Sequence, residues 1–149
     1  MRFLDANIFI YSYYKPRKQL TQKEKEMKEH AKQIISEVSD GKEPVIMTVV
    51  HLSEIVNILK HGMSLEQLTK LVRGLFMLDN VRILGVTREA YFAANELGED
   101  LKLEANDALA LDVMRMNNIK EIYSFDEDFE QIDGITRLPK LTQFIRRDK

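Results

Sequence analysis

The sequence predicts an α/β fold, a three-layer sandwich in which helices cover both faces of a mostly parallel central sheet of about five strands. Two observations predict it. Short apolar runs alternate with helical patterns along the chain, and this order of elements is typical of a parallel sheet. The chain has 149 residues and shows no linker and no internal repeat, which suits one compact domain. We therefore expect a single domain over residues 1–149.

Five short apolar runs are expected to form the strands. Each is bounded by glycine, proline, asparagine or aspartate, and runs of this length with such boundaries are typical of strands. The second run follows Gly41 and Pro44, and the fifth has the weakest pattern. The runs cover residues 3–4, 45–50, 81–84, 121–125 and 135–138.

Helical patterns fill the intervals between these strands. Two of the helix starts have the spacing of a capping box, Thr21 with Glu24 and Ser64 with Gln67. The last helix is apolar nearly all round, so we expect it to be buried. The expected helices cover residues 8–14, 21–38, 52–60, 64–76, 87–97 and 107–116.

The composition excludes several classes of protein. The sequence contains no cysteine, so it forms no disulfide, no thiolate zinc site and no thiol nucleophile. No apolar run approaches the roughly 18 residues of a membrane span, and an acid at position 5 interrupts any signal-peptide layout. We expect a cytoplasmic protein without a membrane partner. The formal net charge of −2 gives no global basic signature, so local basic patches would have to bind nucleic acid.

Four acidic residues from distant segments are predicted to lie at one end of the sheet. Asp5 ends the first strand, and Asp126 follows the fourth. Glu54 lies in the first turns of the helix after the second strand, and Asp107 starts the buried helix that leads into the fourth. Because ligands bind beyond the carboxyl ends of the strands in an open parallel sheet, we expect these acids to share one site.

Such a cluster cannot stay fully ionised unaided, because burial and neighbouring like charges both raise the pKa of a carboxyl group. Either some of the carboxyls are protonated or a cation lies among them. Ligands that are all oxygen, with no cysteine and no nearby histidine, suit Mg²⁺ or Mn²⁺ better than Zn²⁺. Such an ion lowers the pKa of a bound water and screens a phosphate, so phosphodiester hydrolysis needs no protein nucleophile.

Four segments resemble the motifs of PIN domains, in the family's order and over residues 3 to about 140. They are Phe3-Leu4-Asp5-Ala6-Asn7-Ile8-Phe9-Ile10, Glu54 after Thr48, Asn106-Asp107-Ala108-Leu109-Ala110, and Ser124-Phe125-Asp126-Glu127-Asp128-Phe129. The sequence is most similar to the VapC-like toxins of toxin–antitoxin pairs. The resemblance implies a PIN-like fold, an endoribonuclease that uses Mg²⁺ or Mn²⁺, a homodimer and a cognate antitoxin. The long charged helix over residues 21–38 departs from that subgroup.

The resemblance also implies roles for the acids. Asp5, Asp107 and Asp126 would hold the catalytic ion, and Glu54 would bind a second ion or a water in its shell. Each acid has a structural alternative as well. Asp5 could cap the next helix, Glu54 could be a solvated helix residue, and the helix macrodipole could stabilise Asp107. A lone unpaired charge on a buried helix is costly, which favours the ligand role for Asp107.

Three polar neighbours of these acids are expected to support them. Asn7 and Ser124 would orient the carboxylates through hydrogen bonds. Asp128 competes with Asp126, and it would either bind the metal through water or cap the turn at Phe129.

Two further groups of residues leave alternatives open. His51 and His61 fall on one helix face with Glu54 and could contact phosphate, but exposed histidines on an amphipathic helix are the favoured interpretation. An aromatic residue beside basic residues suits single-stranded RNA, whereas the alternative is core packing and a basic loop in water. The residues of this second group are Tyr14, Lys15, Arg17 and Lys18.

Two rival functions remain at this point. A catalytically silent PIN fold could act only as a binding module. A receiver domain also places acids around Mg²⁺, but it would need an adjacent pair of acids after the first strand, and the chain has Asp5-Ala6-Asn7 there. A dinucleotide-binding enzyme is disfavoured, because no glycine-rich fingerprint follows any strand.

Overall fold

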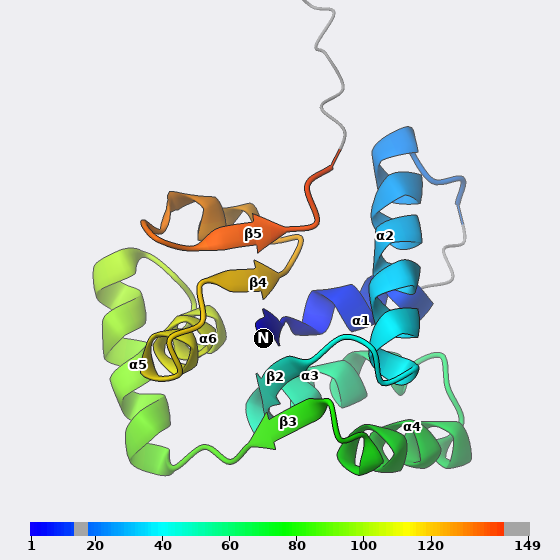
Figure 1. The fold of residues 1–149 in the computed structure, drawn as a ribbon, viewed down its shortest axis with the longest axis horizontal. Helices are drawn as coiled ribbons and strands as arrows, with labels where there is room; N and C mark the ends of the chain where they lie inside the picture. The colour runs from blue at the N-terminus through cyan, green and yellow to red at the C-terminus, as the bar shows by residue number, and fades with distance from the viewer. Residues whose placement is uncertain (14–17, 142–149) are drawn as a thin grey trace, which may run out of the picture.

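A five-stranded parallel sheet forms the middle layer of the protein in the computed structural model, which describes residues 1–13 and 18–141 (Figure 1). The strand order is β3-β2-β1-β4-β5, and all four neighbouring pairs are parallel. The strands are β1 (Arg2–Leu4), β2 (Val45–Thr48), β3 (Val81–Leu84), β4 (Glu121–Tyr123) and β5 (Thr136–Leu138).

Six α-helices and one 3₁₀ helix connect these strands within the described residues. None of these helices is both long enough and apolar enough to cross a membrane. The helices are α1 (Ala6–Tyr13), α2 (Gln22–Ser39), α3 (Val49–Leu59), α4 (Leu65–Met77), α5 (Arg88–Leu101), α6 (Ala105–Met116) and η1 (Glu127–Gln131).

Alternation along the strands divides the core between the two faces of the sheet, because successive side chains of a strand point to opposite sides. Leu4 packs with residues of α1 to α4, whereas its neighbour Phe3 packs with residues of α6. In the same way Met47 and Ile46 of β2 face opposite layers. Figure 1 shows α5 and α6 on one side of the sheet and α2 on the other. The predicted three-layer α/β sandwich is therefore confirmed.

Helix capping explains where several elements begin. Both predicted capping boxes are present, at Thr21 with Glu24 and at Ser64 with Gln67. The predicted strand over residues 45–50 is wrong in its last two residues, because the Thr48 hydroxyl accepts hydrogen bonds from the N–H groups of Val50 and His51 and so starts α3 at residue 49.

Two other helices also begin earlier in the chain than predicted. Helix α1 begins at Ala6 instead of residue 8, directly behind β1. Helix α6 begins at Ala105 instead of residue 107, which places Asp107 inside its first turn. As a result, Asp5 directly precedes α1 and Asp107 is part of α6, so a helix holds the backbone at both acids.

The order of the strands places β1 and β4 side by side at the point where the connections reverse direction. From β1 the chain proceeds to β2 and β3 on one side, and it then crosses to β4 and β5 on the other. In open α/β sheets ligands bind outside the carboxyl ends of the strands at such a point. Asp5 follows β1 there, and Ser124 follows β4.

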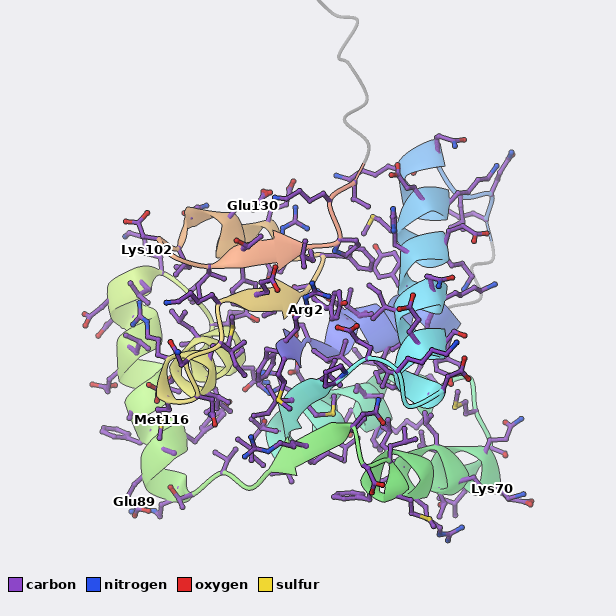
Figure 2. All side chains as sticks on the ribbon, viewed as in Figure 1. Arg2, Lys70, Glu89, Lys102, Met116 and Glu130 are labelled. Carbon is purple, nitrogen blue, oxygen red and sulfur yellow. The ribbon has the colours of Figure 1, made fainter. Side chains whose placement is uncertain are left out.

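Charges at the opposite, amino ends of the strands are paired. The Arg2 guanidinium bonds Glu121 of β4 at 2.9 Å and Glu43, before β2, at 3.1 Å. It also donates to the Tyr123 hydroxyl at 2.5 Å. Figure 2 shows Arg2 beside β4 near the middle of the view, whereas Lys70 and Glu89 lie at the periphery. One cation is therefore shared by two acids at this end of the sheet.

The turn between α5 and α6 depends on a buried glycine. Gly98 accepts a hydrogen bond from the Leu103 N–H at 2.9 Å, and Lys102 closes the helix with a left-handed φ of 59°. A Cβ atom on Gly98 would lie 2.5 Å from the Leu103 carbonyl oxygen and 3.4 Å from the Ala108 Cβ atom. The close approach of α5 to the start of α6 therefore requires glycine at this position.

We predict that Gly98→Ala lowers the free energy of unfolding by about 1–3 kcal/mol, because the added methyl group must displace the turn. The matched control is Gly74→Ala in α4, where an added Cβ meets no atom within 4 Å. Alanine is the better helix former, so this control should stabilise the protein by about 0.4–1 kcal/mol. Urea denaturation measures both changes. Equal effects of the two substitutions would contradict the packing argument.

Candidate metal centre

Asp5 is a buried carboxylate held at the end of β1. Its side chain is buried, with 6% of the residue's surface exposed. One carboxylate oxygen accepts the Ala6 N–H at 2.8 Å, and the other accepts the Ser124 hydroxyl at 2.7 Å. Burial raises the pKa of Asp5 to about 6, with a further increase from the charge of Asp126, although the two hydrogen bonds act in the opposite direction.

Ser124 links the loops that follow β1 and β4. Besides donating to Asp5, its hydroxyl oxygen accepts the Asp126 N–H at 3.0 Å and lies 3.4 Å from the amide nitrogen of Asn7. The Asn7 side-chain oxygen in turn accepts the Phe125 N–H at 3.2 Å. Since Ser124 is fully buried, these bonds fix Asp5 relative to Asp126.

Three carboxylates converge next to this junction. One oxygen from each of Asp107, Asp126 and Asp128 lies within 4.8 Å of the other two. Asp107 comes from the first turn of α6, and the other two come from the start of η1. Asp126, and not Asp128, caps η1, because its side chain accepts the Asp128 N–H at 2.9 Å. Asp128 is exposed, whereas Asp107 and Asp126 are half-buried.

The acids act on one another electrostatically. Burial is the largest cause that raises the pKa of Asp107 to about 8, followed by the charges of Asp5 and Asp126, a hydrogen bond with Asp126 and the charge of Glu54. Burial and the charge of Asp5 also raise the pKa of Glu54. Among the described residues, no lysine, arginine or histidine forms an ion pair with Asp5, Glu54, Asp107 or Asp126.

Glu54 reaches this group from α3 through Asn106. The Asn106 side chain lies close enough to Glu54 to lower its pKa, and its oxygen accepts the Tyr91 hydroxyl of α5 at 2.6 Å. Asn106 precedes Asp107 in α6. The contact therefore joins three helices at the edge of the acid cluster.

His51 is buried, so the prediction that it is exposed on an amphipathic helix is wrong. Its residue surface is 1% exposed, and its ring packs edge-on against Phe3. The ring nitrogens lie 2.7 Å from the Thr48 hydroxyl and 3.0 Å from the Asn106 carbonyl oxygen. Because a carbonyl only accepts, Nε2 carries the proton and Nδ1 accepts from Thr48. Burial lowers the pKa of His51 to about 4, so the ring is neutral.

The early start of α3 explains this difference. With Val49 as the first helical residue, His51 lies in the first turn and packs toward α6 instead of solvent. His61 is exposed, as predicted. The hydrogen bonds of His51, Asn106 and Tyr91 in this region were not predicted from the sequence. The only signal for Asn106 was its place beside Asp107.

The basic residues expected to bind RNA fall mostly outside the described part of the chain. Tyr14, Lys15 and Arg17, three of the four residues of this predicted group, are outside the described residues. Lys18 is described, and it is exposed ahead of α2.

The donors that the structure brings together fit a hard divalent cation. They are carboxylate oxygens, which Mg²⁺ and Mn²⁺ prefer, and their mutual repulsion is relieved either by protons or by a bound cation. Asp107, Asp126 and Asp128 each supply one ligand oxygen, and these oxygens lie within 4.8 Å of one another. The Ser124 hydroxyl connects Asp5 to Asp126, because it donates to the Asp5 carboxylate and accepts the Asp126 N–H.

We predict that the metal-free protein loses stability as the pH rises. The pKa values of Asp5 and Asp107 are raised from 3.8 to about 6 and about 8 by folding, so the folded state holds protons that the unfolded chain has released. Stability is therefore highest below about pH 4 for these two groups and falls until about pH 8.

Urea denaturation in a chelator at pH 5 and pH 8 tests this prediction. Asp107→Asn should be more stable than the wild type at pH 8 and lose less stability between the two pH values. Asp112→Asn, on the same helix but outside the cluster, should behave like the wild type. A wild-type stability that does not fall over this range would contradict the raised pKa values of Asp5 and Asp107.

Three solved structures share this fold. VapC20 of Mycobacterium tuberculosis, described as a toxin that cleaves the sarcin–ricin loop, is 19% identical with a TM-score of 0.64, over 87% of this chain and 93% of that one. A toxin–antitoxin complex from Klebsiella pneumoniae is 17% identical with a TM-score of 0.60, over 91% and 96%. VapBC2 of Rickettsia felis, bound to a fragment of its promoter DNA, is 15% identical with a TM-score of 0.59, over 92% and 96%.

Sequence comparison gives a result of its own. No curated protein sequence matches the chain. The profile of the PIN domain, however, matches residues 2–135, nearly the whole chain. On this evidence the chain belongs to the PIN domain family.

Proposed function

We propose that this protein is a metal-dependent endoribonuclease that hydrolyses RNA phosphodiester bonds with water as the nucleophile. The observation that carries the proposal is the cluster formed by the carboxylates of Asp107, Asp126 and Asp128, with the charges of Asp5 and Glu54 acting on Asp107. None of these acids has a basic ion-pair partner among the described residues. Membership of the PIN family and the sarcin–ricin loop cleavage named for VapC20 support it.

Asp5, Asp107 and Asp126 would hold the ion, Mg²⁺ or Mn²⁺. Asp128 offers an additional oxygen to the same place, and Glu54 would bind a second ion or a water beside it. When bound, the cation lowers the pKa of a water and screens the charge that develops on the phosphate.

The chain's own residues prepare this site in two ways. Ser124 and Asn7 fix the carboxylates at the ends of β1 and β4, so little ordering is left for the moment of binding. Asp107 must lose its proton before it can act as a ligand. Since its pKa is about 8, the affinity for the cation should increase with pH up to that value.

We further propose that the protein is the toxin of a toxin–antitoxin pair and forms a homodimer. The complexes from Klebsiella pneumoniae and Rickettsia felis have this fold and support an antitoxin partner. Leu65 and Phe76 on one face of α4 are 81% and 57% exposed, which supports a second copy as a partner for that face. A small neighbouring reading frame that encodes a DNA-binding protein would strengthen the toxin assignment.

We predict that Asp5→Asn and Asp107→Asn each lower RNA cleavage at least about 100-fold in Mg²⁺ or Mn²⁺, because each substitution removes a charged ligand. Ser124→Ala should lower it about 10- to 100-fold, since it frees Asp5 and Asp126. Asp112→Asn should cleave like the wild type, and a chelator should abolish cleavage. The assay is the rate of cutting of structured and unstructured RNAs.

Two results would contradict the proposal in different ways. Equal cleavage by the wild type and Asp5→Asn would show that the site is wrongly assigned. Tight, acid-dependent metal binding without cleavage of any RNA would favour a catalytically silent PIN module.

In cells the toxin proposal predicts growth arrest when the wild-type chain is expressed alone. Expression of Asp5→Asn should allow normal growth at an equal protein level, because the arrest depends on cleavage. Arrest by both proteins would separate toxicity from the acid site.

A further inference from the structure

An open pocket lies beside the acid cluster, and Glu54 is the only one of its lining residues that the mechanism above uses. Its volume is about 360 Å³, which lies within the range of about 300–1,000 Å³ typical of small-molecule sites. It is lined by Val50, Ser53, Glu54, Asn57, Tyr91 and Asn106.

One face of α3 supplies most of the wall. The lining residues of α3 are spaced three or four positions apart, so their side chains lie above one another on one face of the helix. They are Val50, Ser53, Glu54 and Asn57. Ser53 and Asn57 are exposed, which leaves a hydroxyl and an amide available to a ligand. The remaining residues, Tyr91 and Asn106, come from α5 and α6.

The pocket differs in charge from the neighbouring acid cluster. Glu54 is its only charged lining residue, and the charge of Asp5 acts on it. The other lining residues offer an aromatic ring, an apolar side chain, a hydroxyl and two amides. This combination suits a flat, uncharged group with hydrogen-bonding edges better than it suits a phosphate.

Tyr91 is fixed as a wall of the pocket before any ligand binds. It is 38% exposed, and its hydroxyl is held by Asn106 at 2.6 Å. The backbone of Asn106 is fixed as well, since its carbonyl accepts from His51 at 3.0 Å. A ring that is held in place but partly exposed is a suitable surface for stacking, because little conformational entropy is lost on binding.

Asn106 connects the pocket to the acid cluster. Asn106 lines the pocket, and the next residue, Asp107, belongs to the acid cluster. Glu54, which also lines the pocket, acts on Asp107 through its charge, so the pocket adjoins the acid cluster from α3 as well. In a single strand of RNA, each nucleobase is joined to the neighbouring phosphate through one ribose, so a base can lie beside a site that holds the phosphate.

We propose that this pocket binds the nucleobase next to the scissile phosphate, with Tyr91 as the stacking surface and Ser53 and Asn57 at the hydrogen-bonding edge of the base. The inference rests on the proposed ribonuclease function, and it adds the part of the substrate that would determine base preference at the cut.

Binding of nucleotides that cannot be cleaved tests the pocket directly. The four nucleoside 5′-monophosphates and ribose 5-phosphate, which lacks a base, would be titrated into the protein with Mg²⁺ and followed by NMR at Ser53 and Asn57. At least one nucleotide should bind about fivefold or more tightly than ribose 5-phosphate, since one stacked base is expected to contribute at least this factor.

Variants of two adjacent aromatic residues provide the matched control. Tyr91→Leu should remove the advantage of the base, whereas Tyr91→Phe, which keeps the ring, should retain most of it. Phe92→Leu changes the next residue of α5, which is 66% exposed and does not line the pocket, and it should leave the advantage unchanged. Equal binding of all five ligands, or equal losses in Tyr91→Leu and Phe92→Leu, would overturn the proposal.

Cleavage of RNA with randomised sequence separates this inference from the function on which it rests. The wild type should prefer one base beside the cut, and Asn57→Ala should reduce that preference at least about threefold. If the wild type cuts RNA and the base advantage is absent, the pocket is wrong and the function stands. If no RNA is cut but base-dependent binding persists, the function is wrong and the pocket stands.

Discussion

Repulsion between carboxylates at the carboxyl ends of β1 and β4 is the constraint on which the rest of the site depends. Asp5 is buried there, and Asp107, Asp126 and Glu54 are within reach of its charge. At the amino ends of the same strands Arg2 pairs with Glu43 and Glu121, whereas none of these four acids is paired with a cation among the described residues. Arg137, beside the end of β4, donates instead to the Ser124 carbonyl and pairs with Glu130. The folded chain must therefore hold protons or a divalent ion at this position.

The fold keeps these groups together against their repulsion through neutral hydrogen bonds. Ser124 connects Asp5 to Asp126, and the neutral ring of His51 ties the start of α6 to the start of α3. Asn106 extends this connection to α5 through Tyr91. The same contacts shape the pocket proposed to bind a base, so the site for the phosphate and the site for the base share one support.

Local sequence patterns were sufficient to predict the layers, the five strands and the six α-helices, but not η1, several helix starts or the long-range contacts. The capping boxes at Thr21 and Ser64 are local signals, and the structure has both. The placement of Asp5 and Asp126 follows from a general property of parallel sheets, without knowledge of the strand order. The burial of His51 could not be predicted, because it depends on the Asn106 carbonyl far along the chain. The convergence of Asp128 with Asp107 likewise depends on tertiary structure.

Calorimetric titration of Mn²⁺ near pH 7 tests the central claim most directly. The pKa of about 8 for Asp107 means that a cation among the acids must displace a proton. We expect a binding heat that changes with the ionisation enthalpy of the buffer, and we expect Asp5→Asn to abolish it. The absence of heat in the wild type, or heat that persists unchanged in Asp5→Asn, would contradict the account.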